Sequence, residues 1–378
     1  MIYLDNAATT FPKPMSVRRE INGALTGYGA NPGRGGHKMA IRASEEIYKC
    51  RRKLAEFFGE ENPENVFFTL NCTHAVNIVV KGLLKPGDHV VVSDLEHNAV
   101  MRPLFALKNK DITYSIARVS ESSVEETLDN FRNALQSNTR LVICTHVSNV
   151  WGIKLPIERI TAMCHQYGIP VMIDAAQSAG IFDIDISENK FDFLCMPGHK
   201  GLYGPMGTGA LITSHHDMLD TIIEGGTGSN SAFLSQPDTP PDKLESGTPN
   251  LIGIAGLSAG VDFVKSVSTK KILMHEIKLL THLYDRLSAN PGIVLYTNRP
   301  ESSCTGGVLS FNVRGKDSEA VADYLNRQYG IAVRAGLHCS PAAHKHFNTQ
   351  KTGAVRISPS YFTTMNDINI LSSALTKI

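Results

Sequence analysis

A lysine surrounded by glycines is the residue of this sequence with the clearest chemical potential. Lys200 follows a predicted apolar strand and lies in the segment MPGHKGLYGPMGTG at 196–209. Glycines let the backbone come close to a bound group, and His199 adds a polar contact beside the lysine. A single lysine in a loop is usually a solvated surface charge, so this motif alone leaves both interpretations open. No strand–helix–strand unit follows the glycines, which argues against a dinucleotide site.

Asp174 and Gln177 follow a second apolar strand, in VMIDAAQSAG at 171–180. In an open parallel sheet, ligands bind at the carboxyl ends of the strands. A carboxylate at that place needs a cationic or hydrogen-bonding partner to offset its desolvation. The pyridinium nitrogen of pyridoxal phosphate (PLP) is such a partner, and Gln177 is then within reach of the phenolic oxygen of the cofactor. The alternative is an aspartate that caps the next helix.

Three further polar side chains follow predicted strands. Thr73 begins a helix after FFTL, where backbone N–H groups and a hydroxyl suit a phosphate, although threonine is also a common N-cap. His97 in DLEHNAV suits stacking on a ring or proton transfer, or is structural. Asn149 in THVSNVWG has an amide suited to a ring substituent or a substrate carboxylate. We expect one cleft to collect six side chains: Thr73, His97, Asn149, Asp174, Gln177 and Lys200.

The elements that must position these residues alternate between strand and helix. Apolar runs predict seven strands: Val66–Thr69, His89–Ser93, Ile112–Ala117, Leu141–His146, Pro170–Asp174, Phe191–Cys195 and Gly209–Thr213. Helical spacing predicts helices between most of them, over Thr73–Leu84, Val124–Leu135 and Ile157–Tyr167, after a first helix over Met39–Phe58. This pattern predicts an α/β fold with a mainly parallel seven-stranded sheet between helices.

The pattern changes after about residue 220. Residues 225–250 are rich in Gly, Ser, Thr and Pro and by themselves resemble a linker. A long helical region over Ile252–Leu287 then leads into a smaller α+β pattern. We predict a large domain over 15–262 and a small domain made of 1–14 and 263–378, with the ligand cleft between them.

Composition limits the classes of function. The 378 residues are 42% hydrophobic and 19% charged with a net charge of +1, which suggests neither nucleic acid nor a membrane as partner. No signal-like N-terminus and no apolar run near the roughly 20 residues of a membrane span are visible, so we expect a cytoplasmic protein. Seven cysteines without paired spacing argue against a disulfide framework.

Eight short motifs then point to one family. They are YLDNAATT at 3–10, NPGRGGH at 31–37, EHNAV at 96–100, HVSNVWG at 146–152, DAAQ at 174–177, GHK at 198–200, SGTPN at 246–250 and RAGLHC at 334–339. With this series the chain resembles the cysteine desulfurases and selenocysteine lyases, in the class V aminotransferase group of fold-type I PLP enzymes. The resemblance implies a homodimer with a PLP-binding large domain.

The resemblance also implies cofactor contacts. Lys200 would carry PLP as a Schiff base, Asp174 would pair with the ring nitrogen, Gln177 would contact the phenolic oxygen and His97 would stack on the ring. The other residues that it places around the cofactor are Thr73, His74, Asn149, His199 and Thr248. Thr248 would reach the phosphate of the partner subunit, so 225–250 would be interface rather than linker.

The resemblance assigns the substrate chemistry to the C-terminal part of the chain. Arg356 matches the arginine that grips the substrate carboxylate, as a bidentate guanidinium can. The other substrate-binding candidates are Asn149, Arg334 and His37. Cys339 matches the sulfur acceptor, which would take sulfur from L-cysteine to give alanine and a persulfide. Its thiolate needs activation, for which His338 and Arg334 are the neighbouring candidates.

Departures from the family pattern leave alternatives open. Pro197 stands where a Ser or Thr usually contacts the phosphate, so Thr227 or Thr248 would have to supply the missing hydroxyl. Gly201 resembles a one-residue insertion, and Leu337 stands where the family commonly has a histidine. Selenocysteine as substrate, a different class V PLP reaction with an idle Cys339, and a non-catalytic scaffold stay open. No metal site is expected, with one alternative set: Cys339, His344 and His346. A protein acceptor for the sulfur is expected.

Overall fold

The computed structural model describes residues 1–33 and 35–378. Arg34, in the NPGRGGH motif, lies outside the described residues. Seven strands form the central sheet in the order β2-β8-β7-β6-β5-β3-β4, with β8 antiparallel to its neighbours and the other pairs parallel. Their bounds are β2 Val66–Thr69, β3 His89–Ser93, β4 Thr113–Ala117, β5 Thr139–Thr145, β6 Val171–Asp174, β7 Phe193–Pro197 and β8 Gly209–Ile212. The predicted seven-stranded, mainly parallel α/β fold is confirmed.

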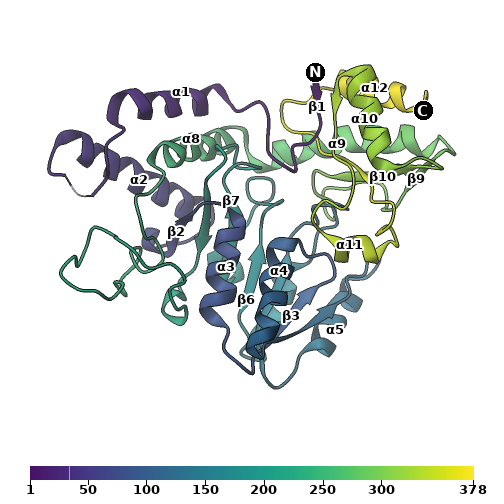
Figure 1. Ribbon diagram of the computed structural model, residues 1–378. Helices are drawn as coiled ribbons and strands as arrows, with labels where there is room; N and C mark the ends of the chain where they lie inside the picture. The colour runs from purple at the N-terminus through teal and green to yellow at the C-terminus, as the bar shows by residue number, and fades with distance from the viewer. Residues whose placement is uncertain (34) are drawn as a thin grey trace.

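Helices cover both faces of this sheet (Figure 1). Alternate strand residues point to opposite faces, so Val90 and Val92 join one hydrophobic cluster and Val91 joins the other. Helices α3 (Cys72–Leu83) and α4 (Asn98–Leu107) pack on the first face. The second face is covered by α2 (Lys38–Phe57), α5 (Val124–Ala134), α6 (Ile157–His165) and α8 (Leu251–Val267). Both faces are therefore buried, as the apolar strands require.

The helical region predicted over Ile252–Leu287 is two helices. α8 ends at Val267 and α9 (Thr269–Ser288) begins after Ser268, at an angle of 77°. Ser268 takes a positive φ of 80°, and its hydroxyl accepts the Lys271 N–H, so it ends one helix and caps the next. Among the described residues no single helix is long and apolar enough to cross a membrane; this bent pair passes on length and composition only.

The C-terminal part builds a second, smaller sheet. Its strands lie in the order β12 (Val355–Ile357), β10 (Leu309–Val313) and β9 (Ile293–Leu295). β1 (Ile2–Tyr3) pairs with β11 (Ile331–Ala332), and Leu4 is buried in the C-terminal hydrophobic cluster. Figure 1 shows the two termini close together beside these elements. The first residues thus pack with the last third, while the exact domain boundaries stay a prediction.

The remaining helices complete the fold. They are α1 (Met15–Gly23), α7 (Ile186–Asn189), α10 (Ser318–Tyr329), α11 (Pro341–His346) and α12 (Met365–Leu375). Residues 225–250 form neither helix nor strand and lie as a long loop at one side of the large sheet (Figure 1).

Candidate active site

A cavity of about 250 Å³ lies at the carboxyl ends of the central strands. It collects ten of the residues predicted to form the site: Thr73, His97, Asn149, Asp174, Gln177, His199, Lys200, Arg334, Cys339 and Arg356. The first seven come from the central sheet and its loops, and the last three from the C-terminal part. The expectation that the strand-end residues meet in one cleft is therefore confirmed, whereas their individual chemical roles stay predictions.

Lys200 lies in a tight loop directly after β7. The Tyr203 N–H donates to the carbonyl oxygen of Lys200 at 2.8 Å, and the Gly204 N–H donates to that of Gly198 at 2.8 Å. A Cβ at Gly204 would lie 2.8 Å from the Gly198 oxygen, so the loop requires glycine there. Burial lowers the pKa of Lys200, with a smaller opposing effect of Asp174. The interpretation as a solvated surface lysine is wrong, because the amine is desolvated.

Asp174 is the last residue of β6, and it is 2% exposed. Its Oδ1 accepts the Ala176 N–H at 2.8 Å and the Cys72 thiol at 3.4 Å. No helix starts within the next ten residues, because α7 begins only at Ile186. The alternative of a helix-capping aspartate is therefore wrong. The second oxygen, Oδ2, has no hydrogen bond to a described residue and is left for a ligand.

The N-terminus of α3 faces the same cavity. Asn71 is the N-cap, since its side chain accepts the His74 N–H at 2.9 Å. Thr73 is thus not the cap: its hydroxyl stays exposed among the free N–H groups of the first turn. His199 lies opposite with a buried Nδ1 that has no partner among the described residues. Burial, then Lys200, lowers the pKa of His199 to about 4. This arrangement of donors suits a phosphate.

His97 reaches the cavity as the N-cap of α4. The Ala99 N–H donates to its Nδ1 at 3.0 Å, so a neutral ring would carry its proton on Nε2. Burial lowers the pKa of His97 to about 4, against an opposing effect of Asp174. The ring is therefore neutral near pH 7. A neutral aromatic ring fits the predicted stacking, and Nε2 is the nitrogen left for proton exchange.

Arg356 and its partners form the side of the cavity that comes from β12. The guanidinium is 1% exposed; Nη1 donates to the Asn149 carbonyl at 2.9 Å and Nη2 to Asp5 at 2.7 Å. Its Nε is buried without a partner among the described residues. The cavity is lined by two arginines, one lysine and one carboxylate: Arg334, Arg356, Lys200 and Asp174. The excess of positive charge favours an anionic ligand.

Cys339 is exposed on a loop whose backbone is unusual. Gly336, His338 and Cys339 all have positive φ, at 92°, 50° and 57°. Two consecutive non-glycine residues in this region are costly and must be held by their surroundings. The Asn149 amide holds them: its Nδ2 donates to the His338 carbonyl at 2.8 Å, and its Oδ1 accepts the Ser340 hydroxyl at 2.7 Å. The amide of Asn149 is thus engaged with this loop.

Only one of the two predicted activators of the thiol is suitably placed. Nη2 of Arg334 lies 4.0 Å from Sγ of Cys339. His338 is buried, and its Nε2 lies 3.0 Å from the Ala354 carbonyl oxygen, to which it donates. Burial, then Arg356, lowers the pKa of His338 to about 3, so its ring carries no charge. The expectation that His338 helps to activate Cys339 is wrong, because the ring is neutral and turned toward β12.

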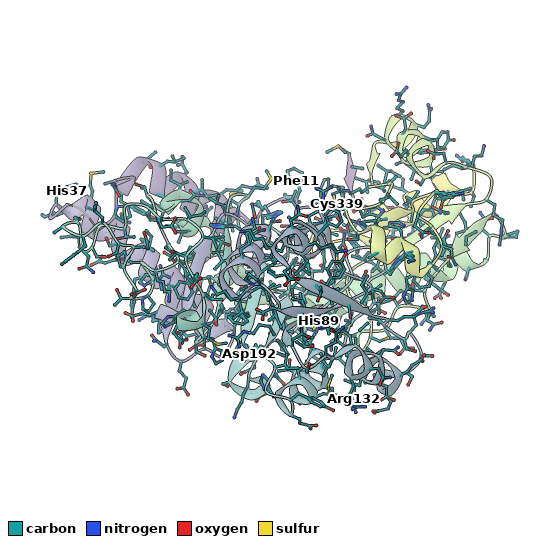
Figure 2. The ribbon with its side chains drawn as sticks, turned by 60° about the horizontal axis from the view of Figure 1, so that its bottom comes forward. Phe11, His37, His89, Arg132, Asp192 and Cys339 are labelled. Atoms are coloured by element: carbon teal, nitrogen blue, oxygen red, sulfur yellow. The ribbon has the colours of Figure 1, made fainter. Side chains whose placement is uncertain are left out.

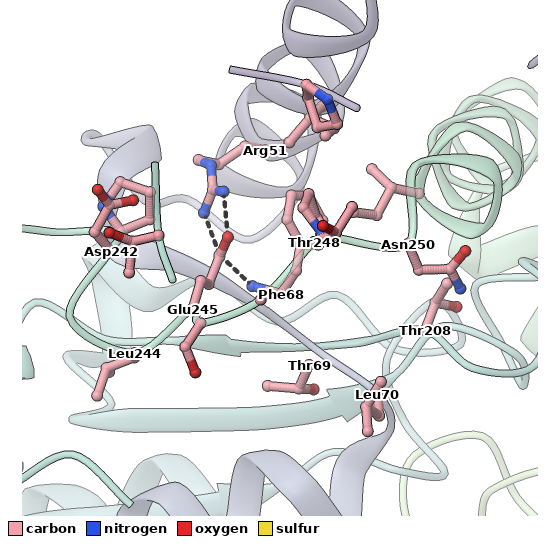
Figure 3. A pocket seen from close by; sticks show the side chains of 18 of the residues that line it. Arg51, Phe68, Thr69, Leu70, Thr208, Asp242, Leu244, Glu245, Thr248 and Asn250 are labelled. Atoms are coloured by element: carbon pink, nitrogen blue, oxygen red, sulfur yellow. Dashed lines mark hydrogen bonds and ion pairs between the residues drawn. The ribbon is translucent and has the colours of Figure 1, made fainter. Parts of the chain in front are cut away.

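Three predicted residues lie elsewhere. His74 and Thr248 line a second cavity of about 420 Å³, together with Thr227. Figure 3 shows Thr248 there, to the right of an ion pair between Arg51 and Glu245. The Glu245 carboxylate accepts both Arg51 Nη groups, at 2.7 and 2.9 Å, and the Phe68 N–H. His37 is the exposed N-cap of α2, and Figure 2 shows it at the left edge of the molecule, far from Cys339, which lies near the middle. Within one chain these side chains are not part of the strand-end site.

The departures from the family pattern have local explanations. Pro197 is the last residue of β7 and lines the cavity, where it offers no hydroxyl. Gly201 packs against the chain at Ala179, whose carbonyl oxygen would lie 2.4 Å from a Cβ. His344 binds the Thr349 hydroxyl and His346 binds Asp94, each at 2.7 Å. No set of three or more metal-ligating side chains occurs in residues 1–33 and 35–378, so the alternative metal set with Cys339 is not assembled.

Sequence reasoning missed several residues at the site. Asn71 and Cys72 line the cavity from the start of α3. Asp5 pairs with Arg356, and Glu96 accepts the Ser93 hydroxyl at 2.5 Å and the Thr145 N–H at 2.7 Å. Asp5 and Glu96 lie inside the motifs YLDNAATT and EHNAV, which was the only signal that marked them.

The side chains that line this cavity match the groups of PLP. A desolvated lysine, a buried carboxylate with one uncommitted oxygen, and a neutral histidine face one cavity. The helix N-terminus at Thr73 and the unpartnered Nδ1 of His199 provide donors for a phosphate.

Comparison with known proteins agrees with this geometry. The model of the family "Aminotransferase class-V" matches residues 2–371. A probable cysteine desulfurase of Methanothermobacter thermautotrophicus is 34% identical, over 100% of this chain and 94% of its own. The chain belongs to the class V aminotransferase family. The predicted likeness to the cysteine desulfurases is thereby confirmed.

Two solved structures of relatives extend the comparison. The apo structure of a cysteine desulfurase from Thermococcus onnurineus NA1 has a TM-score of 0.90 and 27% identity, covering 100% of this chain and 94% of that one. The cysteine desulfurase CsdA of Escherichia coli, as its S-sulfonic acid, has a TM-score of 0.86 and 27% identity, covering 99% and 94%. The whole chain, both sheets included, shares the fold of these enzymes.

Proposed function

We propose that this class V family member is a PLP-dependent cysteine desulfurase. It would convert L-cysteine to L-alanine and leave a persulfide on Cys339, from which a protein acceptor takes the sulfur. The observation that carries the proposal is that one cavity joins Lys200 and Asp174 to Arg356 and an exposed Cys339. Relatives of the chain named as cysteine desulfurases support it.

Residues of the strand-end cavity would hold the cofactor and act on it. PLP, when bound, supplies an electrophilic carbon and an electron sink for bonds at the substrate α-carbon. Asp174 would bind the ring nitrogen, and the start of α3 with His199 would bind the phosphate. The lowered pKa of Lys200 favours its neutral amine, the form that bonds to a carbonyl carbon or takes a proton on Nζ.

Arg356 would orient the substrate. Its Nε is a buried donor without a partner among the described residues, and the Nη groups are fixed by Asp5 and the Asn149 carbonyl. A guanidinium held in this way binds a carboxylate in one orientation, with little entropy left to lose. The substrate sulfur is then expected to point toward the mouth of the cavity, where Cys339 lies.

Cys339 would receive the sulfur. The thiolate is the reactive form, and Arg334 is the cationic side chain beside its Sγ. The Cβ–S bond of the substrate breaks and an S–S bond forms to Cys339. One cysteine and one enzyme thiol give one alanine and one enzyme persulfide, so the step needs no external oxidant or reductant.

A product assay on two variants tests the proposal. Wild type is expected to be yellow and to form alanine from L-cysteine. Lys200→Ala is expected to lose the colour, and Cys339→Ala to keep the colour but lose alanine formation from cysteine. Unchanged alanine formation by Cys339→Ala would mean that the family fold carries a different reaction here with an idle thiol. No colour in wild type after addition of PLP would instead indicate a non-catalytic protein.

Three finer features belong to the same proposal. We propose a homodimer in which Thr248 reaches the partner's cofactor, which agrees with its position outside the strand-end cavity. Sedimentation of the purified protein tests the dimer. We also propose a cytoplasmic location. Selenocysteine is an alternative substrate, and the same assay run with selenocysteine measures it.

A further inference from the structure

A second, much smaller cavity lies behind the Lys200 loop. It measures about 30 Å³ and is lined by Lys200, Gly201, Gln177 and Thr10 from the large-sheet side, and by Glu276 on α9. Gly307 and Ser358, at the start of β10 and the end of β12, close it. The cavity is thus placed where the C-terminal elements touch the loop that carries the functional lysine.

Glu276 is the unusual member of this group. It is 4% exposed, in the middle of α9, and no hydrogen bond or ion pair with a described residue satisfies its carboxyl group. One carboxyl oxygen packs against Gly307, where a Cβ would lie 2.2 Å away. Burial alone raises the pKa of Glu276. A buried acid without a partner is costly unless something polar meets it.

The cavity has the size and the lining that a water molecule needs. Space for one probe sphere requires at least about 10–15 Å³, which the cavity exceeds, and a buried water usually has two to four polar partners. The Glu276 carboxyl and Oε1 of Gln177 have no hydrogen bond to a described residue, while Nε2 of Gln177 donates to the Ala7 carbonyl at 3.1 Å. Thr10, in contrast, already donates to the carbonyl oxygens of His199 and Lys200.

We infer that Glu276 is a positioning residue, which binds a water in this cavity and through it ties α9 to Gln177 and the Lys200 loop. It touches neither substrate nor cofactor. The inference relies on the proposed function only in taking Lys200 as the functional lysine.

A structural measurement tests the water directly. A high-resolution crystal structure of the holoenzyme is expected to show a water within hydrogen-bond distance of the Glu276 carboxyl and the Gln177 amide. A dry cavity, or a Glu276 carboxyl bonded to protein alone, would overturn the inference.

Variants test the positioning role. Glu276→Gln keeps the shape and a hydrogen-bonding group, Glu276→Leu keeps only the bulk, and Lys278→Leu changes an exposed residue of the same helix. Hydrogen exchange in the holoenzyme is read at the Tyr203 and Gly204 amides, which close the Lys200 loop. We expect exchange about fivefold faster in Glu276→Leu, as for the loss of one hydrogen bond, and wild-type rates in Glu276→Gln and Lys278→Leu.

Two outcomes for Glu276→Leu would contradict or replace this test. If Glu276→Leu leaves these amides unchanged and raises the melting temperature, the acid is only an unsatisfied core group and has no positioning role. If Glu276→Leu does not fold, Glu276→Met serves in its place. Exchange is read without substrate, so failure of the desulfurase assay would not affect this result.

Discussion

The two walls of the active-site cavity are built differently. The wall with Lys200 and Asp174 consists of strand ends; Asp174 is buried, and backbone hydrogen bonds close the loop that carries Lys200. The wall with Cys339 is an exposed loop in a strained conformation, held by the side chain of Asn149. Cofactor binding needs a rigid, dry site, whereas a thiol that passes sulfur to another protein must be exposed. This difference agrees with the proposed function, in which the first wall holds the cofactor and the second passes on the sulfur.

We expect the largest effect from the loss of Lys200 in the rigid wall. Lys200→Ala is expected to lose the yellow colour and to lower alanine formation by roughly 10³-fold or more, because both the bonding amine and the base disappear. Lys81→Ala, exposed on α3, is the matched control and should keep both. Colour that persists in Lys200→Ala would place the functional lysine elsewhere.

Arg356 joins the two walls, so its loss should act next most strongly. Arg356→Gln removes the charge proposed to bind the substrate carboxylate and leaves Asp5 without its ion-pair partner. Since hydrogen bonds between charged groups contribute about 1.5–3 kcal/mol each, we expect kcat/KM to fall at least about 10²-fold, with the cofactor still bound. Steady-state kinetics with L-cysteine checks this, and Arg327→Gln, exposed on α10, is the control. A KM close to that of wild type would mean that the carboxylate binds elsewhere.

The loop wall can be loosened by itself. Asn149→Ala removes both hydrogen bonds that flank Cys339. At about 1 kcal/mol for each bond, we expect persulfide formation to slow by about thirtyfold while the absorption of the bound cofactor stays unchanged. Ser340→Ala removes one of the two bonds and should give an intermediate value. Equal rates in all three proteins would show that the loop conformation does not limit sulfur transfer.

The smallest expected effect is a pH dependence of the free energy of unfolding, caused by Glu96. Burial, opposed in part by the Ser93 hydroxyl, raises the pKa of Glu96 to about 8. The folded state then holds a proton that the unfolded state releases above its usual pKa of about 4.5, so stability is lost as pH rises from about 4.5 to 8. Glu96→Gln should flatten this part of the curve of unfolding free energy against pH. An identical slope in the variant would mean that Glu96 is ionised in the folded protein.

The rigid wall could be predicted from the sequence and the loop wall only in part. Apolar runs such as HVVVS and VMID mark strands, and strands of a parallel sheet end at one edge, so His97 and Asp174 had to lie near each other. Lys200 was placed for the same reason. These positions could be predicted because they follow from local patterns in the sequence.

The loop wall depends on contacts between distant residues, which no local pattern reveals. Asn149 holds residues about 190 positions away. His338 lies next to Cys339 in the sequence, yet its ring turns to Ala354 and is neutral. The turn at Ser268 and the direction of Glu276 on α9 were hidden in the same way, because a helical pattern does not say what its buried acid meets.

The position of the persulfide tests the central claim most directly. Two cysteines are exposed among the described residues, Cys339 and Cys304, so Cys304→Ser is the matched control. After incubation with L-cysteine, peptide mass spectrometry should find one added sulfur on the Cys339 peptide of wild type and of Cys304→Ser. Cys339→Ser should carry none. Added sulfur on another cysteine, or none in wild type while alanine still forms, would contradict sulfur transfer to Cys339.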